Sequence, residues 1–120
     1  MRRTRRHQEI LCRLAIMDEA FVADLTVPGP GHACSRLVLD LKTAALVRVA
    51  ALAAIGSPAV CLEWSATRAL AAGATEDEIT DVLLAIAPVA GLGRVVSAVP
   101  GVADAFGYDI DAALEDPDGH

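Results

Sequence analysis

The chain has 120 residues, a net charge of −6 at pH 7, a hydrophobic fraction of 54% and only 3% aromatic residues. This length predicts one domain, and a core of alanine, valine, leucine and isoleucine favours closely packed helices. From His7 onward six basic residues face sixteen acidic ones, which excludes a nucleic-acid-binding role for the domain. No uncharged stretch approaches the roughly 20 residues that a membrane-spanning helix needs, so we also expect no membrane partner.

The first 25 residues are predicted to form a basic arm followed by a helix. Four arginines lie within the first six residues, and a solvated terminus is preferred to contact with an anionic surface. Apolar residues then recur at steps of three and four from Arg6 to about Ala23, which indicates one amphipathic helix. Charged residues interrupt this segment too often for the apolar run of a secretory signal, so we expect a cytoplasmic protein.

A helical domain is predicted for residues 39–115, after a loop rich in proline and glycine at residues 26–38. Its predicted helices are 41–55, 58–72, 76–90, 94–99 and 102–106, followed by a short helical turn within 109–115 and a disordered tail at 116–120. The first of these helices is apolar nearly all round, so we expect it to be central and buried. No segment shows the period of two that indicates a strand, and the fold is therefore predicted to be all-α.

Residue types that favour helix ends mark these boundaries. Asp40 precedes the first helix of the domain and Ser57 the second, where each is expected to accept a hydrogen bond from a backbone N–H. Thr75 and Glu78 have the spacing of a capping box at the start of the third helix. Gly56 is expected to end the first helix in a left-handed conformation.

The order of these signals resembles that of the carboxymuconolactone decarboxylase family, which includes the alkylhydroperoxidase D-like proteins. The resemblance spans about Leu39 to Ala105 and is most specific in A-L-x-x-G-A-T-x-x-E-I, residues 69–79. It implies an alkylhydroperoxidase D-like helical bundle whose subunits form trimers or hexamers. It also implies sites that lie between helices, near the contacts between subunits.

The chain departs from this family at the residues that carry its chemistry. Redox members have C-x-x-C and a histidine four residues after the second cysteine, and those positions are here Pro58, Cys61 and Ser65. Many members also have an Arg-Glu pair on the preceding helix, which falls on Ala44 and Ala45. The resemblance therefore predicts the fold but not the family's reactions.

Cys61 has two interpretations, a reactive thiol or a small buried hydrophobe. Its position near a helix N-terminus favours the thiolate, whereas the nearby carboxylate of Glu63 opposes it. Cys34 could act as a second thiol, or His32 as a base for Ser65, only if the loop folds over the helix. A buried structural cysteine is the preferred interpretation.

The neighbours of Cys61 supply the other candidates. Glu63 is the candidate general acid or base, but a spacing of two residues turns it about 200° round the helix from Cys61, so we do not expect both to face one cavity. A solvated or ion-paired glutamate is the preferred interpretation. Ser65 is expected to donate to the carbonyl one turn back or to a ligand. Trp64 is expected to stack with Arg68 one turn further on, and to act as an interface anchor or a pocket wall.

Arg48 and Arg94 lie in apolar stretches, where a guanidinium needs an acid or an anion as its partner. Ion pairs with Glu78, Asp81 or Asp104 are one explanation, and binding of a substrate carboxylate is the other. The three cysteines lie far apart and the histidines have no clustered carboxylates, so neither a disulfide framework nor a metal site is expected. No cofactor is predicted.

Three functions remain open at this stage. The leading hypothesis is a cofactor-free enzyme of the lyase or isomerase type, acting on a small organic acid, lactone or related metabolite. Its candidate residues are Cys61, Glu63 and Ser65 for catalysis, with Arg48, Trp64 and Arg94 for substrate binding. The alternatives are a non-catalytic oligomeric protein that binds a ligand or has a structural role, and a single-cysteine peroxide reductase that uses Cys61. The expected partners are a small-molecule ligand and further copies of the chain.

Overall fold

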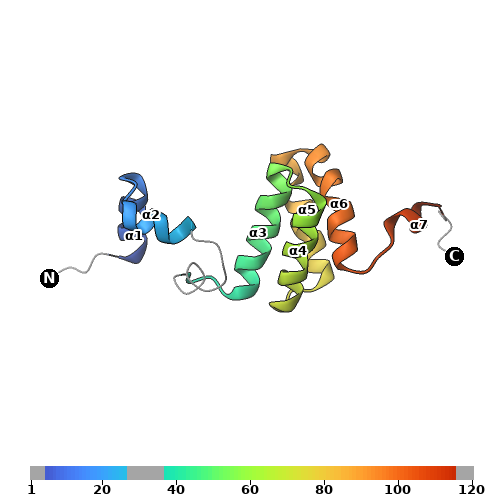
Figure 1. The fold of residues 1–120 in the computed structure, drawn as a ribbon, viewed down its shortest axis with the longest axis horizontal. Helices are drawn as coiled ribbons and strands as arrows, with labels where there is room; N and C mark the ends of the chain where they lie inside the picture. The colour runs from blue at the N-terminus through green and yellow to red at the C-terminus, as the bar shows by residue number, and fades with distance from the viewer. Residues whose placement is uncertain (1–4, 27–36, 116–120) are drawn as a thin grey trace. The chain divides into compact units, whose positions relative to one another are not determined.

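All regular elements are α-helices within residues 5–26 and 37–115, which are the residues that the computed structural model of the protein describes (Figure 1). They are α1 (Arg6–Ala15), α2 (Glu19–Thr26), α3 (Leu41–Ile55), α4 (Ala59–Ala71), α5 (Glu76–Ala90), α6 (Leu92–Ala105) and α7 (Ile110–Glu115). The prediction of an all-α fold is therefore confirmed. The chain divides into two compact units, residues 1–38 and residues 39–120.

Residues 6–26 of the first unit form two short helices where the periodicity predicted one, so that prediction is wrong. Helix α1 ends at Ala15, and Met17 has a left-handed backbone with φ of 53°. The carboxylate of Asp18 accepts a hydrogen bond from the N–H of Phe21 at 3.0 Å, at the start of α2. Because an aspartate side chain competes for the free N–H groups of a new helix, it favours a helix start over a continuing helix.

In the second unit, α3, α4, α5 and α6 lie side by side as a bundle, as Figure 1 shows. The largest fully buried side chains are Val49 from α3, Leu62 from α4 and Ile79 from α5. Much of the remaining core consists of small residues, mainly alanine and valine. Small side chains let the helices approach closely, so the bundle needs almost no aromatic residue to fill its centre.

Most of the predicted helix ends are confirmed. The Asp40 carboxylate accepts from the N–H of Thr43 at 2.7 Å, and Thr75 with Glu78 forms the predicted capping box on α5. Gly56 ends α3 with φ of 75°, and two backbone hydrogen bonds close the turn there, as in a Schellman motif. Ser57 is not the cap of α4, since the N-cap is Pro58 and the helix begins at Ala59.

Helix α6 differs from its prediction because it runs through a proline. Two helices were expected on either side of Pro100, but α6 is continuous from Leu92 to Ala105. Proline removes one backbone N–H from the helix, and the exposed position of Pro100 leaves the carbonyl one turn earlier to solvent. Packing of the rest of the helix on the bundle offsets this loss.

Helix α3 was expected to be buried all round, and this is wrong for a single copy of the chain. Its inner side packs in the core through Ala44, Val49 and Ala53. Val47 and Ile55, however, are more than half exposed on its outer side. The apolar surface is thus larger than one bundle covers.

The position of α4 is set by its close approach to α6 at Gly101. A side chain at this glycine would collide with the carbonyl oxygen of Ala59 and lie 2.8 Å from the Cβ of Leu62. Real Cβ atoms do not approach one another so closely, so only glycine allows this crossing. The crossing packs the inner side of α4 against α6, while its outer side stays exposed.

Candidate functional site

An open hollow of about 470 Å³ lies on the outer side of α4. The described residues that line it are Val60, Cys61, Glu63, Trp64 and Thr67, all from this helix. Val60, Glu63, Trp64 and Thr67 follow the spacing of three and four residues that places side chains on one helical face. The described part of the lining is thus the largely solvent-exposed face of α4.

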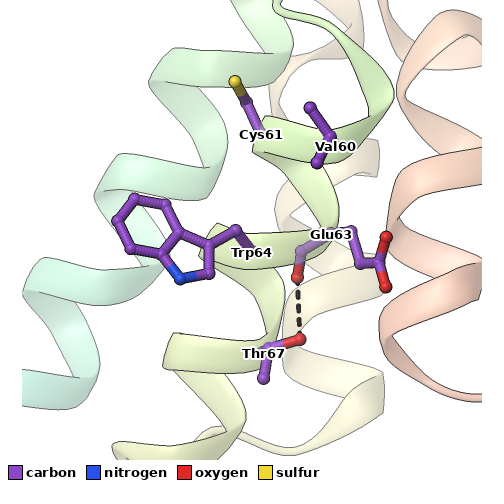
Figure 2. Close-up of a pocket in the computed structure, with 5 residues that line it drawn as sticks. All are labelled: Val60, Cys61, Glu63, Trp64 and Thr67. Carbon is purple, nitrogen blue, oxygen red and sulfur yellow. Dashed lines mark hydrogen bonds between the residues drawn. The ribbon is translucent and has the colours of Figure 1, made fainter.

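The side chains around the hollow differ in exposure and direction. Cys61 is half-buried and free, and Trp64 is 65% exposed. Figure 2 shows the indole of Trp64 directed towards α3, while the carboxylate of Glu63 points away from it. The expectation that Cys61 and Glu63 cannot share a cavity is wrong, because the hollow is open enough to reach both in spite of their divergence.

Ser65 lies on the opposite side of α4 from this hollow. It is buried in the bundle, and its hydroxyl donates to the carbonyl oxygen of Leu62 at 3.1 Å. This hydrogen bond is one of the two roles that the sequence suggested. Cys61 and Ser65 therefore do not converge on one site, although they are one turn apart.

The expected stack of Arg68 on Trp64 is present. The guanidinium carbon of Arg68 lies 5.2 Å from the centre of the indole ring, within the range of a cation–π contact. Arg68 is exposed beside the hollow. The contact holds the indole and brings a positive charge to the edge of the site.

Thr67 completes the polar side of the hollow. Its hydroxyl donates to the backbone carbonyl of Glu63 at 2.8 Å, as Figure 2 shows. The donor is thus used within the helix, and the lone pairs of the oxygen are left as acceptors. Thr67 and Val60 were missed as candidates, and their spacing of three or four residues from Glu63 and Trp64 was the signal that could have found them.

The two other candidate arginines are not among the lining residues. Arg48 is exposed on α3. Arg94, in the first turn of α6, donates to the carbonyl of Ile55 at 3.2 Å and lies over the backbone of Gly56. A cation at the end of α3 also compensates the negative end of the helix dipole. Arg94 thus ties α6 to α3 through a carbonyl, and its role towards a substrate stays a prediction.

Glu78, one of the acids considered for these arginines, is bound elsewhere. Its carboxylate accepts from Lys42 of α3 at 3.0 Å and from the N–H of Thr75 at 2.9 Å. The hydrogen bond from the Thr75 backbone, and after it the one from Lys42, hold the pKa of Glu78 below its usual value of 4.5. At the start of α3, the side chain and then the backbone of Thr43 likewise lower the pKa of Asp40.

Neither a cluster of metal-binding side chains nor a membrane-spanning helix is present among the described residues. In the described ranges 5–26 and 37–115, no group of three histidine, cysteine, aspartate or glutamate side chains is placed to hold a metal ion. None of the described helices has the length and apolar character needed to cross a bilayer. His32 and Cys34, the loop residues considered as partners for Ser65 and Cys61, fall outside the described residues.

Comparison with protein families gives one match. The model of the Carboxymuconolactone decarboxylase family matches residues 33–104, more than half of the chain. This range contains α3, α4 and α5 and nearly all of α6, and therefore every described residue that lines the hollow. Neither the curated proteins nor the solved structures gave a match.

Proposed function

Because the chain belongs to the carboxymuconolactone decarboxylase family, we propose that the hollow on α4 binds a small organic acid, lactone or related metabolite. The observation that carries this proposal is the mixed lining of the hollow. Val60 and Trp64 offer an apolar wall, while Glu63 and Thr67 offer polar groups on the same helical face. Few polar groups in an apolar setting are typical of sites that orient a small ligand.

The reaction that fits this lining is a proton transfer without a cofactor, of the lyase or isomerase type. Glu63 is the carboxylate at the hollow and would move the proton, since the family's histidine position is occupied by Ser65. Ser65 is buried behind the hollow, so it supports the helix rather than the reaction. Arg68, stacked on Trp64, would attract an anionic substrate to the edge of the site.

Calorimetry and turnover assays with small carboxylates and lactones test this proposal. We expect Glu63→Gln to abolish turnover while binding persists, and Trp64→Ala to weaken binding at least tenfold. The matched control is Glu115→Gln on α7, which removes one exposed carboxylate from another helix and should change neither quantity. Unchanged turnover in Glu63→Gln, or no binding by any compound of the set, contradicts the proposal.

A second candidate function is binding without catalysis, in a homo-oligomer that covers the hollow. It is favoured by the exposed apolar side chains of the bundle, namely Val60 and Trp64 at the hollow and Val47 and Ile55 on α3. Exposed apolar surface of this kind marks contacts between proteins. Under this alternative the Glu63→Gln variant binds ligand normally, turnover is absent in the wild type, and Trp64→Ala lowers the oligomer mass measured by light scattering.

A third candidate is peroxide reduction at Cys61, which is a free thiol at the hollow. The thiolate would attack the peroxide bond, releasing an alcohol or water and leaving a sulfenic acid that an external thiol reduces. Cys61→Ser would then abolish peroxide consumption, while Cys12→Ser would leave it unchanged. Equal consumption by the wild type and Cys61→Ser rejects this candidate.

A further inference from the structure

Helix α4 carries one acidic and one basic side chain, and they lie on opposite flanks of its exposed side. Glu63 and Arg68 are five residues apart, which turns them about 140° round the helix and separates their Cα atoms by about 9 Å. Thr67 and Trp64 lie in the arc between them, the threonine beside Glu63 and the tryptophan beside Arg68. Figure 2 shows the carboxylate of Glu63 and the indole of Trp64 directed to opposite sides of the helix. The hollow therefore has an acidic flank and a basic flank.

The basic flank offers only hydrogen-bond donors. The guanidinium of Arg68 is held against the indole of Trp64, 5.2 Å from the ring centre. Among the described residues it makes no ion pair and no hydrogen bond, so its N–H groups are available to a ligand. Because the stack already orients the guanidinium, binding a ligand costs it less conformational freedom. This flank suits a carboxylate, which can accept two parallel hydrogen bonds from one guanidinium.

The acidic flank offers only hydrogen-bond acceptors. Within the described part of the chain, the carboxylate of Glu63 has no ion pair, and the hydroxyl proton of Thr67 is used by the backbone carbonyl of Glu63 at 2.8 Å. A ligand group that lies here must therefore donate, as a hydroxyl or an amino group does. A second carboxylate would be repelled by Glu63, and the carbonyl of a lactone would find no donor.

The surface between the two flanks is apolar and partly flat. Trp64 is 65% exposed and Val60 is 68% exposed, so both can cover a ligand. An indole ring packs best against another flat, unsaturated group, which gains about 0.5–1.5 kcal/mol from stacking beyond the area that it buries. The middle of a well-matched ligand is therefore a flat apolar body.

We propose that the hollow selects a monocarboxylate with a flat apolar body and a hydroxyl or amino group at its far end. The carboxylate binds Arg68, the body covers Trp64, and the donating group binds Glu63 and Thr67. This inference rests on the proposed function and narrows it, since lactones and dicarboxylates become the weaker ligands. It also makes the carboxylate an anchor, because Glu63 then acts at the opposite end of the ligand.

The test is calorimetry of the full-length chain with matched derivatives of benzoate. The probe is para-hydroxymethylbenzoate, which carries both end groups on a flat ring. In para-methylbenzoate the hydroxyl is missing, in terephthalate a second carboxylate replaces it, and in para-hydroxymethylbenzamide the negative charge is missing. We expect the probe to bind about threefold or more tighter than each of the others, since hydrogen bonds to exposed charged groups contribute modestly.

Variants of Arg68 assign the carboxylate end. Arg68→Gln should remove the preference for the benzoate over the benzamide, and Arg68→Lys should keep part of it, since lysine keeps the charge but not the paired donors. The matched control is Arg13→Gln in the other unit of the chain, where the guanidinium lies 5.9 Å from the ring centre of Phe21. This control removes the same charge and the same kind of stack, and should leave the preference unchanged.

Variants of the acidic flank assign the donating end. Thr67→Val should reduce the preference for the probe over para-methylbenzoate, and Glu63→Gln should tighten the binding of terephthalate. The matched control is Thr80→Val on α5, because the hydroxyl of Thr80 likewise donates to the carbonyl one turn back, that of Glu76, at 2.9 Å. Thr80→Val should change the affinity of none of the compounds.

Two results overturn this inference and leave the proposed function standing. One is binding of para-methylbenzoate or terephthalate as tight as that of the probe. The other is a preference for the benzoate over the benzamide that Arg68→Gln does not change. Binding of aliphatic acids or lactones at the hollow, with none by the probe, also rejects the inference alone, whereas no binding by any compound rejects both.

Discussion

The two sides of α4 are built from different kinds of residue. The inner side carries Leu62, Ser65, Ala66 and Ala69, which are buried, and its one polar group donates to a backbone carbonyl of the same helix. The outer side carries a cysteine, a glutamate, a tryptophan and a threonine around an open hollow. Packing in the core explains the residue types of the inner side. The residues of the outer side do not pack in the core, so their identities need another explanation.

This difference indicates where function can be sought in a chain whose family residues are missing. A side chain that fills the core is explained by the free energy of folding. Trp64 is not explained in this way, because an indole that is 65% exposed stabilises the bundle little. Changes on the inner side should therefore alter stability, and changes on the outer side should alter binding or assembly.

The largest effect is expected from shortening the inner side of α4. Leu62→Ala should lower the free energy of unfolding by about 2–5 kcal/mol, because it leaves a cavity in the centre of the bundle. Val60→Ala, two residues away on the exposed side, should change it by no more than about 0.5 kcal/mol. Urea unfolding of both variants measures the contrast, and equal losses would remove the distinction between the two sides.

A smaller loss is expected where α6 crosses α4. Gly101→Ala should destabilise the protein by about 1–3 kcal/mol, since the added methyl group overlaps the backbone of Ala59. Gly93→Ala, in the same helix but with open space around it, should be neutral or stabilising by up to about 1 kcal/mol. If Gly101→Ala has the same stability as Gly93→Ala, α6 does not approach α4 as closely at Gly101 as the structure indicates.

A pH-dependent effect is expected from Glu78, which ties α5 to α3 away from the hollow. Its lowered pKa means that the folded protein favours the charged carboxylate. The stability gained is present above the usual pKa of 4.5 and is lost as the pH falls through the lower value of the folded state. Glu78→Gln should therefore make thermal stability fall less steeply between neutral and acid pH. Ligand binding at the outer side of α4 should not follow this change.

The smallest expected effect concerns the cysteines. Cys12 is exposed on α1 and Cys61 is half-buried on α4. Alkylation followed by peptide mass spectrometry should therefore modify Cys12 first, with Cys61 reacting more slowly in the folded protein. A ligand in the hollow should slow Cys61 further and leave Cys12 unaffected. Faster reaction of Cys61 would indicate an activated thiol and favour the peroxide reductase.

The sequence was sufficient for most of the bundle because its helices begin and end at residues with local effects. Asp40, Thr75 and Gly56 act through the backbone beside them, so the residues that determine their conformation are their neighbours in the sequence. Pro100 led to a wrong prediction of two helices. The free energy that proline costs within a helix is offset by tertiary packing, which a local sequence pattern does not show. The break at Met17 was hidden by a periodicity that continues across it.

The site was less predictable, because it depends on which side of a helix faces the core. Spacing placed Ser65 one turn from Cys61, but the packing of α4 in the bundle buries the serine and leaves the cysteine at the hollow. Arg94 looked like an anion-binding residue, and its hydrogen bond goes to the backbone of Ile55. A carbonyl partner of this kind leaves no signature in the sequence.

The fluorescence of Trp64 tests the central claim, that the outer side of α4 is a binding surface. Trp64 is the only tryptophan in the chain, so its emission reports this surface alone. We predict that titration with small carboxylates and lactones gives a saturable change in emission with at least one compound, and that Thr67→Ala weakens it while Glu115→Gln does not. An emission spectrum that no compound of the set alters, in a protein shown to be folded, contradicts the account.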